Sequence, residues 1–133
     1  MIKLTIPGEP VAKGRPRVTR YGTYTPEKTK NYETLVKELY FMEHGQTLLE
    51  GELNIDIKAY FRIPKSAAKT KKLHMASGKI RPTKRPDWDN VGKTVTDALN
   101  GVAYEDDSQI VSATVEKYYS EEPRTEIKIE RID

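Results

Sequence analysis

The carboxylates with the spacing for chemistry fall into two short groups. Asp87 and Asp89 flank one tryptophan, and the run Glu105-Asp106-Asp107 follows further along the chain. An extended segment would point Asp87 and Asp89 to opposite faces, but a turn at the start of a helix can bring them together. Carboxylate oxygens are the ligands that hard cations such as Mg²⁺ prefer. If the two groups converge, they predict a cation site, and Lys93 would add a positive charge beside it.

A magnesium ion held there would suit phosphodiester cleavage, because it can lower the pKa of a water and clamp a phosphate. Each part of the pattern also has an ordinary structural interpretation. Asp89 would cap a helix and pair with Lys93 at i,i+4, Asp106-Asp107 would form a turn, and Trp88 would anchor that helix start as an apolar residue. The chain has no cysteine and two histidines, which excludes thiol catalysis and zinc centres built from these residues.

The helix that must position the first group is predicted to begin at Asp89 and to end at Asn100-Gly101. Its apolar face consists of Val91, Val95, Ala98 and Leu99. A helix of about 12 residues spans about 18 Å. The second acidic group therefore reaches the first only if the following strand runs back alongside the helix, or if the acidic loop folds over.

The remaining elements follow from apolar periodicity and from Gly and Pro. A helix is expected from an N-cap at Thr25, with Pro26 at its first position, to about Gly45. Its apolar stripe would be Tyr32, Leu35, Val36, Leu39 and Met42. The segment before it, from residue 7 to 25, is expected to be irregular, and residues 66–77 form either a short lysine-rich helix or a loop that orders on a partner. Strands are expected at 2–6, 53–63, 109–119 and 124–132.

This order of elements predicts an α+β fold, with a small mixed β-sheet packed with two or three helices, in one domain spanning residues 1–133.

The net charge of +3 conceals two strongly basic segments. Residues 10–26 contain four Lys or Arg and residues 57–86 contain ten, and neither segment has an acid. Basic segments interleaved with Tyr, Gly and Pro suit phosphates and bases, although a solvated basic face is the alternative for either one. No apolar run is long enough for a membrane helix or a signal peptide. We expect a cytoplasmic protein that binds nucleic acid and no membrane.

Three blocks of the sequence resemble one known family. They are Pro86-Asp87-Trp88-Asp89-Asn90-Val91-Gly92-Lys93, Asp97-Ala98-Leu99-Asn100-Gly101 and Asp106-Asp107-Ser108-Gln109-Ile110. Together they resemble the RusA family of Holliday-junction resolvases, which are small phage- and prophage-associated endonucleases. The core of the match covers residues 86–110, and a D-x-D-N-x-x-K block followed at this distance by D-D-x-Q is a specific combination.

The resemblance implies a RusA-like fold and a homodimer that binds four-way DNA junctions and nicks two strands symmetrically during recombination and repair. It further implies that Asp87, Asp89 and Asp107 bind Mg²⁺ and that Lys93 is required for cleavage. An alignment with the family can require a one-residue gap before the D-D pair, so Asp106 competes with Asp107 for the ligand role. Charge and position add a set of expected DNA-binding residues, which are Lys13, Arg15, Arg17, Arg20, Lys84, Arg85 and Asn90.

Two other functions fit parts of the sequence. Asp87 with Glu126 and Lys128 matches the P-D…(D/E)-x-K pattern of restriction-like nucleases. That interpretation makes Asp89 and Asp107 dispensable. A non-catalytic phage nucleic-acid-binding protein, with its carboxylates serving only as caps and turns, is the second alternative.

Overall fold

The computed structural model describes residues 1–12, 17–20, 22–24 and 27–132. A four-stranded mixed sheet and three helices make up the fold, which confirms the predicted α+β class. The elements in chain order are β1 (Ile2–Pro7), β2 (Arg17–Thr19), β3 (Gly22–Tyr24), α1 (Glu27–His44), β4 (Leu53–Arg62), α2 (Lys69–Ala76), α3 (Trp88–Leu99), the 3₁₀ turn η1 (Asp107–Gln109), β5 (Ile110–Ser120) and β6 (Arg124–Arg131).

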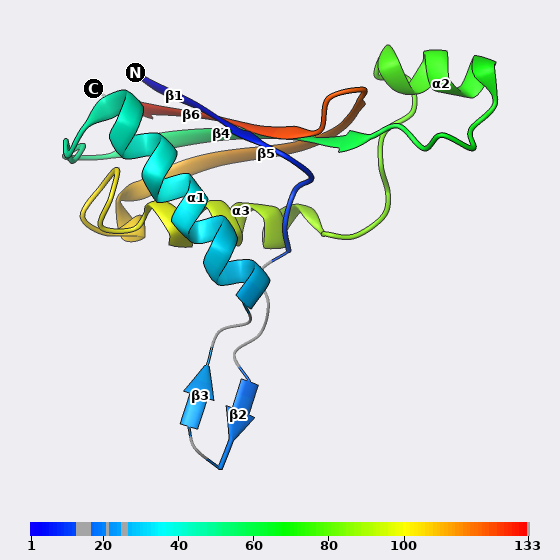
Figure 1. The fold of residues 1–133 in the computed structure, drawn as a ribbon. Coiled ribbons are helices and arrows are strands. Elements are labelled where there is room, and N and C mark those ends of the chain that lie inside the picture. The colour runs from blue at the N-terminus through cyan, green and yellow to red at the C-terminus, as the bar shows by residue number, and fades with distance from the viewer. Residues whose placement is uncertain (13–16, 21, 25–26, 133) are drawn as a thin grey trace.

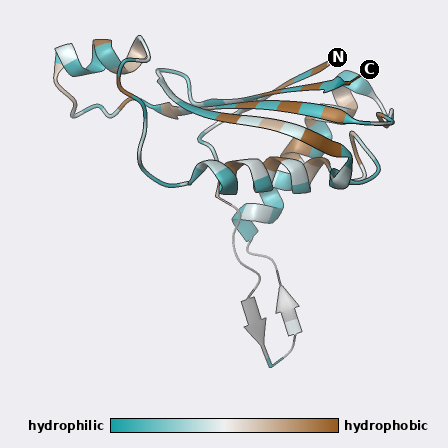
Figure 2. Cartoon of the chain, turned by 180° about the vertical axis from the view of Figure 1, so that it is seen from behind, coloured by the Kyte–Doolittle hydropathy of each residue, from teal (hydrophilic) through white to brown (hydrophobic). Residues whose placement is uncertain are grey.

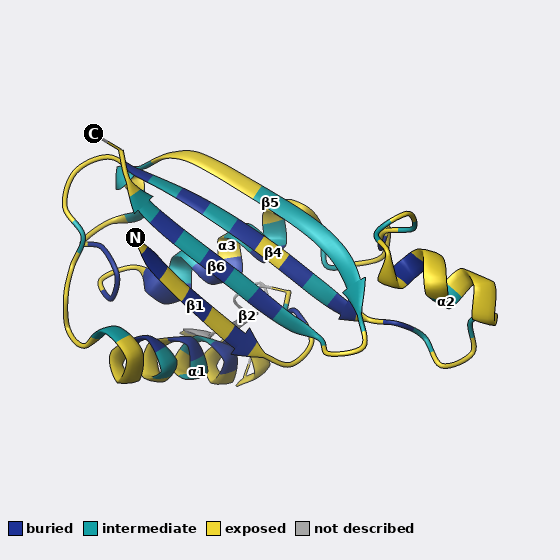
Figure 3. Cartoon of the chain, turned by 90° about the horizontal axis from the view of Figure 1, so that it is seen from above, coloured by how far each residue is buried: buried dark blue, intermediate teal, exposed yellow. Residues whose placement is uncertain are grey.

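The sheet has the strand order β1-β6-β4-β5, so β1 and β5 are its edges. Strand β6 pairs antiparallel with both β1 and β4, whereas β5 pairs parallel with β4. Helices α1 and α3 lie on one face of the sheet, and no helix of the described residues covers the other face of these four strands (Figures 1 and 3). The single parallel pair requires a crossover from β4 to β5, and this crossover contains α2 and α3.

The core lies between the sheet and these two helices. Apolar residues alternate with polar ones along the strands, as the bands in Figure 2 show, and the apolar set of β4 is buried on the helix side. Helix α1 buries Tyr32, Val36 and Tyr40, but Met42 is 83% exposed. The prediction for Met42 was wrong because a residue two positions beyond Tyr40 is turned about 200° around a helix of 3.6 residues per turn. Tyr40 fills the core instead.

The crossover elements begin and end close to their predicted positions. Residues 69–76 are helical, so the helix alternative for the lysine-rich segment is confirmed. Helix α3 begins at Trp88, with Asp87 rather than Asp89 as its N-cap. It ends at Leu99, with Asn100 as its C-cap and Gly101 at a φ of 75°. The predicted apolar face of α3 is buried.

The segment before α1 differs from its prediction. Strands β2 and β3 pair antiparallel where an irregular loop was expected. The Gly and Pro residues were taken to exclude strands, but a short hairpin tolerates Gly22, which has a φ of 125°. The expected cap residues Thr25 and Pro26 lie outside the described residues. No helix in the described ranges is long and apolar enough to cross a membrane.

Candidate active site

The first turn of α3 presents two carboxylates and an indole to solvent. Asp87, Trp88 and Asp89 are all exposed, and Trp88 retains 65% of its accessible surface. Asp87 has the extended backbone of an N-cap, but its side chain makes no capping hydrogen bond. Asp89 accepts one hydrogen bond, at 3.0 Å, from the backbone N–H of Asn90. The prediction of Trp88 as a packed anchor was wrong, and most of the carboxylate oxygens at this helix end remain available.

A lysine on β5 lies beside this helix end. Lys117 Nζ donates to the carbonyl of Lys84 at 2.6 Å and lies 5.2 Å from the Phe61 ring centroid. Burial lowers the pKa of Lys117, while the negative charge of Asp87 opposes that shift. Lys117 therefore fastens the segment that leads to Asp87 and places a cation near that carboxylate.

Sequence reasoning missed Lys117. Its proximity to Asp87 depends on β5 running back along α3, where Val115 faces Gly92, and no local pattern reports that contact.

The same segment is fastened a second time through Arg81. Its Nε donates to the carbonyl of Lys117 at 2.8 Å, and its guanidinium lies 4.2 Å from the centroid of the Tyr118 ring. Tyr118 in turn stacks on Tyr60 at 5.5 Å. Tyr60 alternates along β4 with the buried Ala59 and Phe61, so it points to the sheet face opposite the helices. The chain entering α3 is thus attached to the end of the edge strand β5.

Helix α2 extends beyond the end of the sheet and forms the tip of a basic arm, which we define as residues 64–86 (Figures 1 and 3). Met75 is 5% exposed and anchors the helix, whereas Lys69 and Lys71 are exposed. Among the described residues, no acidic group lies within ion-pairing distance of the α2 lysines. Arg81 of the arm pairs with Glu116 at 3.6 Å, but the α2 lysines have no such partner in the described ranges, so the arm carries an excess of positive charge next to the start of α3.

The C-terminal end of α3 is built differently. The side chain of Asn100 accepts a hydrogen bond from the backbone N–H of Asp107 at 2.9 Å. Asp106 caps η1, because its carboxylate accepts hydrogen bonds from the hydroxyl and the backbone N–H of Ser108. These bonds hold the pKa of Asp106 below its ordinary value.

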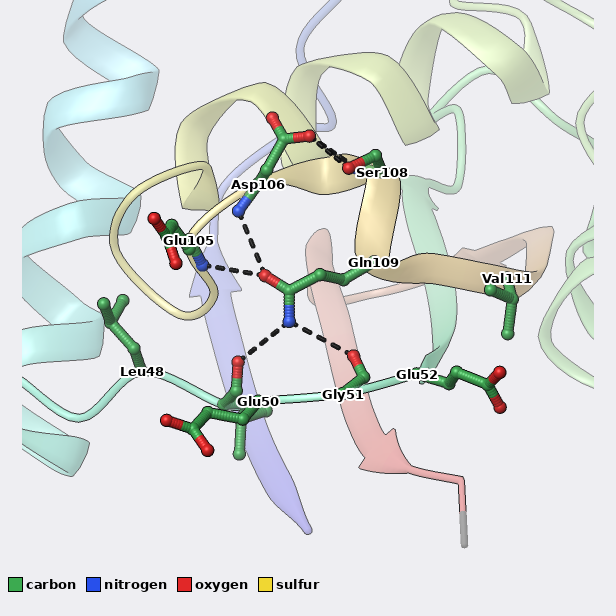
Figure 4. Close-up of a pocket in the computed structure, with 10 residues that line it drawn as sticks. Leu48, Glu50, Gly51, Glu52, Glu105, Asp106, Ser108, Gln109 and Val111 are labelled. Atoms are coloured by element: carbon green, nitrogen blue, oxygen red, sulfur yellow. Dashed lines mark hydrogen bonds between the residues drawn. The ribbon is translucent and has the colours of Figure 1, made fainter.

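Gln109 ties this end of α3 to the loop before β4. Its side-chain oxygen accepts from the N–H groups of Glu105 and Asp106, and its amide donates to the carbonyls of Leu49 and Gly51 (Figure 4). These residues line a hollow of about 640 Å³ that also contains Glu50 and Glu52. The hollow carries acidic side chains and lies away from the basic arm.

Asp107 differs from its neighbour Asp106. No hydrogen bond from a described residue reaches the Asp107 carboxylate, whereas the Asp106 carboxylate is occupied by Ser108. Burial raises the pKa of Tyr104, and the negative charges of Asp107 and Asp97 raise it further. Of the two adjacent aspartates, Asp107 is therefore the one whose two carboxylate oxygens are both free of described donors.

The two acidic groups lie at opposite ends of α3. Asp107 is bonded to Asn100 at the C-cap, while Asp87 is the N-cap. A helix of this length spans about 18 Å. Strand β5 does run back along α3, but it brings Lys117 rather than Asp107 to the helix start. Within the described ranges, no three His, Asp or Glu residues form a group that could hold a metal. One chain therefore does not bring the predicted ligands together.

Lys93 lies one turn into α3. Its Nζ is 3.6 Å from an oxygen of Asp97, and 64% of its side chain is exposed. The sequence predicts a pair of Lys93 with Asp89, four residues before it. In the structure Lys93 pairs instead with Asp97, four residues after it. Its exposure leaves the ammonium group accessible to a phosphate.

The other predicted site residues are scattered. Lys84 and Arg85 are exposed on the basic arm, Asn90 is half-buried in α3, and Arg20 is exposed at the turn of the β2–β3 hairpin. The two residues of the restriction-like alternative lie on β6, where Glu126 pairs with Arg124 at 2.9 Å and Lys128 pairs with Glu130 at 3.0 Å. Outside the described part of the chain lie Lys13, Arg15 and the side chain of Arg17.

Comparison with known proteins gives two matches over most of the chain. The family described as Endodeoxyribonuclease RusA matches residues 7–130. The chain is also 43% identical over 137 aligned positions to the uncharacterized protein YqaN of Bacillus subtilis (strain 168), and the alignment covers 98% of this chain and 96% of that protein.

Proposed function

Because the chain belongs to the RusA family of endodeoxyribonucleases, we propose that it resolves four-way DNA junctions by Mg²⁺-dependent, symmetric nicking of two strands. The observation that carries this proposal is the first turn of α3. Two exposed carboxylates lie there directly after a basic arm, and no capping bond occupies Asp87. Carboxylates in that position are suited to bind a cation that is also bound by a phosphate of the DNA backbone.

The donors at the start of α3 fit magnesium in kind. Mg²⁺ is commonly bound by one or two carboxylates and keeps several waters, so Asp87 and Asp89 would hold it. When bound, the ion would polarise the scissile phosphate and lower the pKa of a water. Lys93 and Lys117 would offset the charge of the phosphate, because both ammonium groups belong to the surroundings of this helix end.

The position of Asp107 implies that a site with all three carboxylates forms only in a dimer. Asp107 is at the opposite end of α3 from Asp87, so a site that uses all three carboxylates takes Asp107 from a second copy of the chain. In a two-fold homodimer, such sharing creates two equal sites. Paired nicking of two symmetry-related strands is the activity that two equal sites would produce.

The basic arm and the β2–β3 hairpin would bind the DNA backbone. Exposed cations on the arm include Lys69, Lys71, Lys84 and Arg85. Neutralising phosphates with such residues makes binding fall steeply with salt. These contacts fix orientation without reading base sequence.

The test is cleavage of a synthetic four-way junction and of a matched linear duplex, with Mg²⁺ and with EDTA. We expect paired nicks in the junction only when Mg²⁺ is present. Asp87→Asn should reduce junction cleavage at least about 100-fold, because a ligand is lost, and should leave junction binding within about threefold, because the basic surface is intact. Gel-shift titrations measure the binding.

Glu126→Gln is the matched control, because it also neutralises one carboxylate but lies on β6. Loss of cleavage with this variant, together with full activity of Asp89→Asn and of Asp107→Asn, would favour the restriction-like alternative. DNA binding without any Mg²⁺-dependent cleavage by the unmodified protein would favour the non-catalytic alternative.

A further inference from the structure

Trp88 is an exposed aromatic residue at the point where chemistry is proposed. It is the one tryptophan of the chain, and 65% of its surface is accessible. No described ring stacks on it and no described cation lies over it. Tryptophan is highly buried on average in folded proteins. Packing against the described residues therefore does not explain why a tryptophan occupies this position.

Other aromatic side chains of the chain have partners. The facing rings of Tyr60 and Tyr118 cover each other, and their outer faces carry the guanidinium groups of Arg124 and Arg81 at 3.9 and 4.2 Å. Tyr104 is fully buried. By contrast, Trp88 offers ring surface that the described residues leave open, so a flat ligand could stack there.

The neighbours of Trp88 indicate what that ligand is. Asp87 and Asp89 adjoin it in the chain, and consecutive Cα atoms are about 3.8 Å apart. Lys84 and Arg85 lie just upstream on the basic arm. An anionic backbone held by these cations carries bases, and every base has a face that can stack on an aromatic ring. A base on Trp88 would hold its own phosphates close to the two carboxylates.

We infer that Trp88 stacks on a nucleobase at the branch point and thereby selects branched DNA over continuous duplex, an inference that rests on the function proposed above. A base in an uninterrupted duplex is stacked on both sides, so it must first be unstacked, and that cost is smallest where pairing is already interrupted. The indole next to the carboxylates couples recognition of such a base to cleavage of its strand.

A second copy of the chain is the competing occupant of this surface. Charged residues are depleted in the centres of protein interfaces. Trp88 is bordered by Asp87, Asp89 and, one turn on, Lys93. These charged neighbours suit binding of DNA with a bound cation better than burial in the centre of a protein–protein interface.

The test uses tryptophan fluorescence, excited at a wavelength that the eight tyrosines do not absorb, because Trp88 is the one tryptophan of the chain. We expect a four-way junction, added in Ca²⁺ without Mg²⁺, to quench this emission, and an equal amount of linear duplex to quench it much less. Trp88→Leu should raise the KM for junction cleavage roughly tenfold, as expected for the loss of one stacked base, with a smaller change in kcat. Trp88→Phe should restore most of the loss.

Phe41→Leu is the matched control, because Phe41 is also an exposed aromatic, at 40%, and lies on α1. It should leave KM unchanged. Unmodified protein that cleaves junctions while Trp88→Leu has the same KM would overturn the inference and leave the proposed function standing. Quenching of equal extent by the four-way junction and by the linear duplex would also overturn it, since Trp88 would then not distinguish branched from continuous DNA. Absence of Mg²⁺-dependent cleavage by the unmodified protein would instead reject the proposed function.

Discussion

The two ends of α3 carry similar polar residues, but those at one end are hydrogen-bonded within the fold and those at the other are largely not. At the C-terminal end, Asn100, Asp106 and Gln109 bond to neighbouring backbone and to Ser108, so their polar atoms serve the fold. At the N-terminal end, Asp87 makes no capping bond and Trp88 is exposed. Polar groups that a fold has already satisfied have little left for a ligand. The difference therefore assigns stability to one end and ligand binding to the other.

Asp107 is the exception within the C-terminal end. Its backbone is bonded to Asn100, but its carboxylate is not occupied by a described donor. It is thus held firmly in place with its oxygens free. This combination suits a residue that the fold holds in position for contact with another molecule.

The largest expected effect comes from mixing two inactive variants. Asp87→Asn and Asp107→Asn homodimers should each lose junction cleavage at least about 100-fold. A heterodimer with one variant in each protomer should recover cleavage, because one of its two shared sites then keeps all three carboxylates. Differently tagged chains, purified through both tags, provide the heterodimer, and single nicks measured on a four-way junction report its one intact site.

The control for this experiment is a heterodimer of Asp87→Asn with Asp89→Asn, in which both sites are damaged under either arrangement. Both heterodimers inactive would mean that Asp107 does not act across the protomers.

A smaller effect on stability is expected from Gln109→Leu. The change leaves the N–H groups of Glu105 and Asp106 and the carbonyls of Leu49 and Gly51 without this partner. Most of these groups lie at the surface, where water can replace the lost amide, so we expect a loss of about 1 kcal/mol of unfolding free energy. Urea denaturation followed by circular dichroism measures it. Glu50→Leu in the same hollow is the control, and equal unfolding midpoints for the two variants would contradict a clamp role for Gln109.

The smallest effect is a pH dependence at Asp106. Its pKa lies below the ordinary value of 3.8 because Ser108 bonds to the ionised form. The resulting stabilisation is fully present above pH 3.8 and is lost as the pH falls through the lower folded-state pKa. The unfolding midpoint of the unmodified protein should therefore decline more than that of Asp106→Asn as the pH is lowered from 5 to about 2.5. Parallel declines would show that the carboxylate has no such role.

Much of the fold could be predicted from the sequence because its signals are local. The alternation in residues 53–63 and the apolar face of α3 both report a buried side that the structure contains. The errors occurred where local signals compete. A capping aspartate at 89 is as plausible as one at 87, and exposure of Trp88 cannot be read from its hydrophobicity.

The candidate site could be predicted in composition but not in arrangement. The D-x-D-N-x-x-K and D-D-x-Q blocks identify the carboxylates, and the family match over residues 7–130 bears out the recognition. Their separation by the length of α3 and the approach of Lys117 to Asp87 depend on contacts between distant segments. Such contacts produce no local or periodic pattern in the amino-acid sequence from which they could be predicted.

The sequence by itself determined which residues are available for chemistry, because side-chain type fixes charge, ligand preference and helix or strand periodicity. Only the tertiary structure decided which of them share a neighbourhood. The antiparallel passage of β5 along α3 places Lys117 at the carboxylates and leaves Asp107 at the far end, because a helix keeps its two ends apart and a returning strand can bring only its later residues to the helix start.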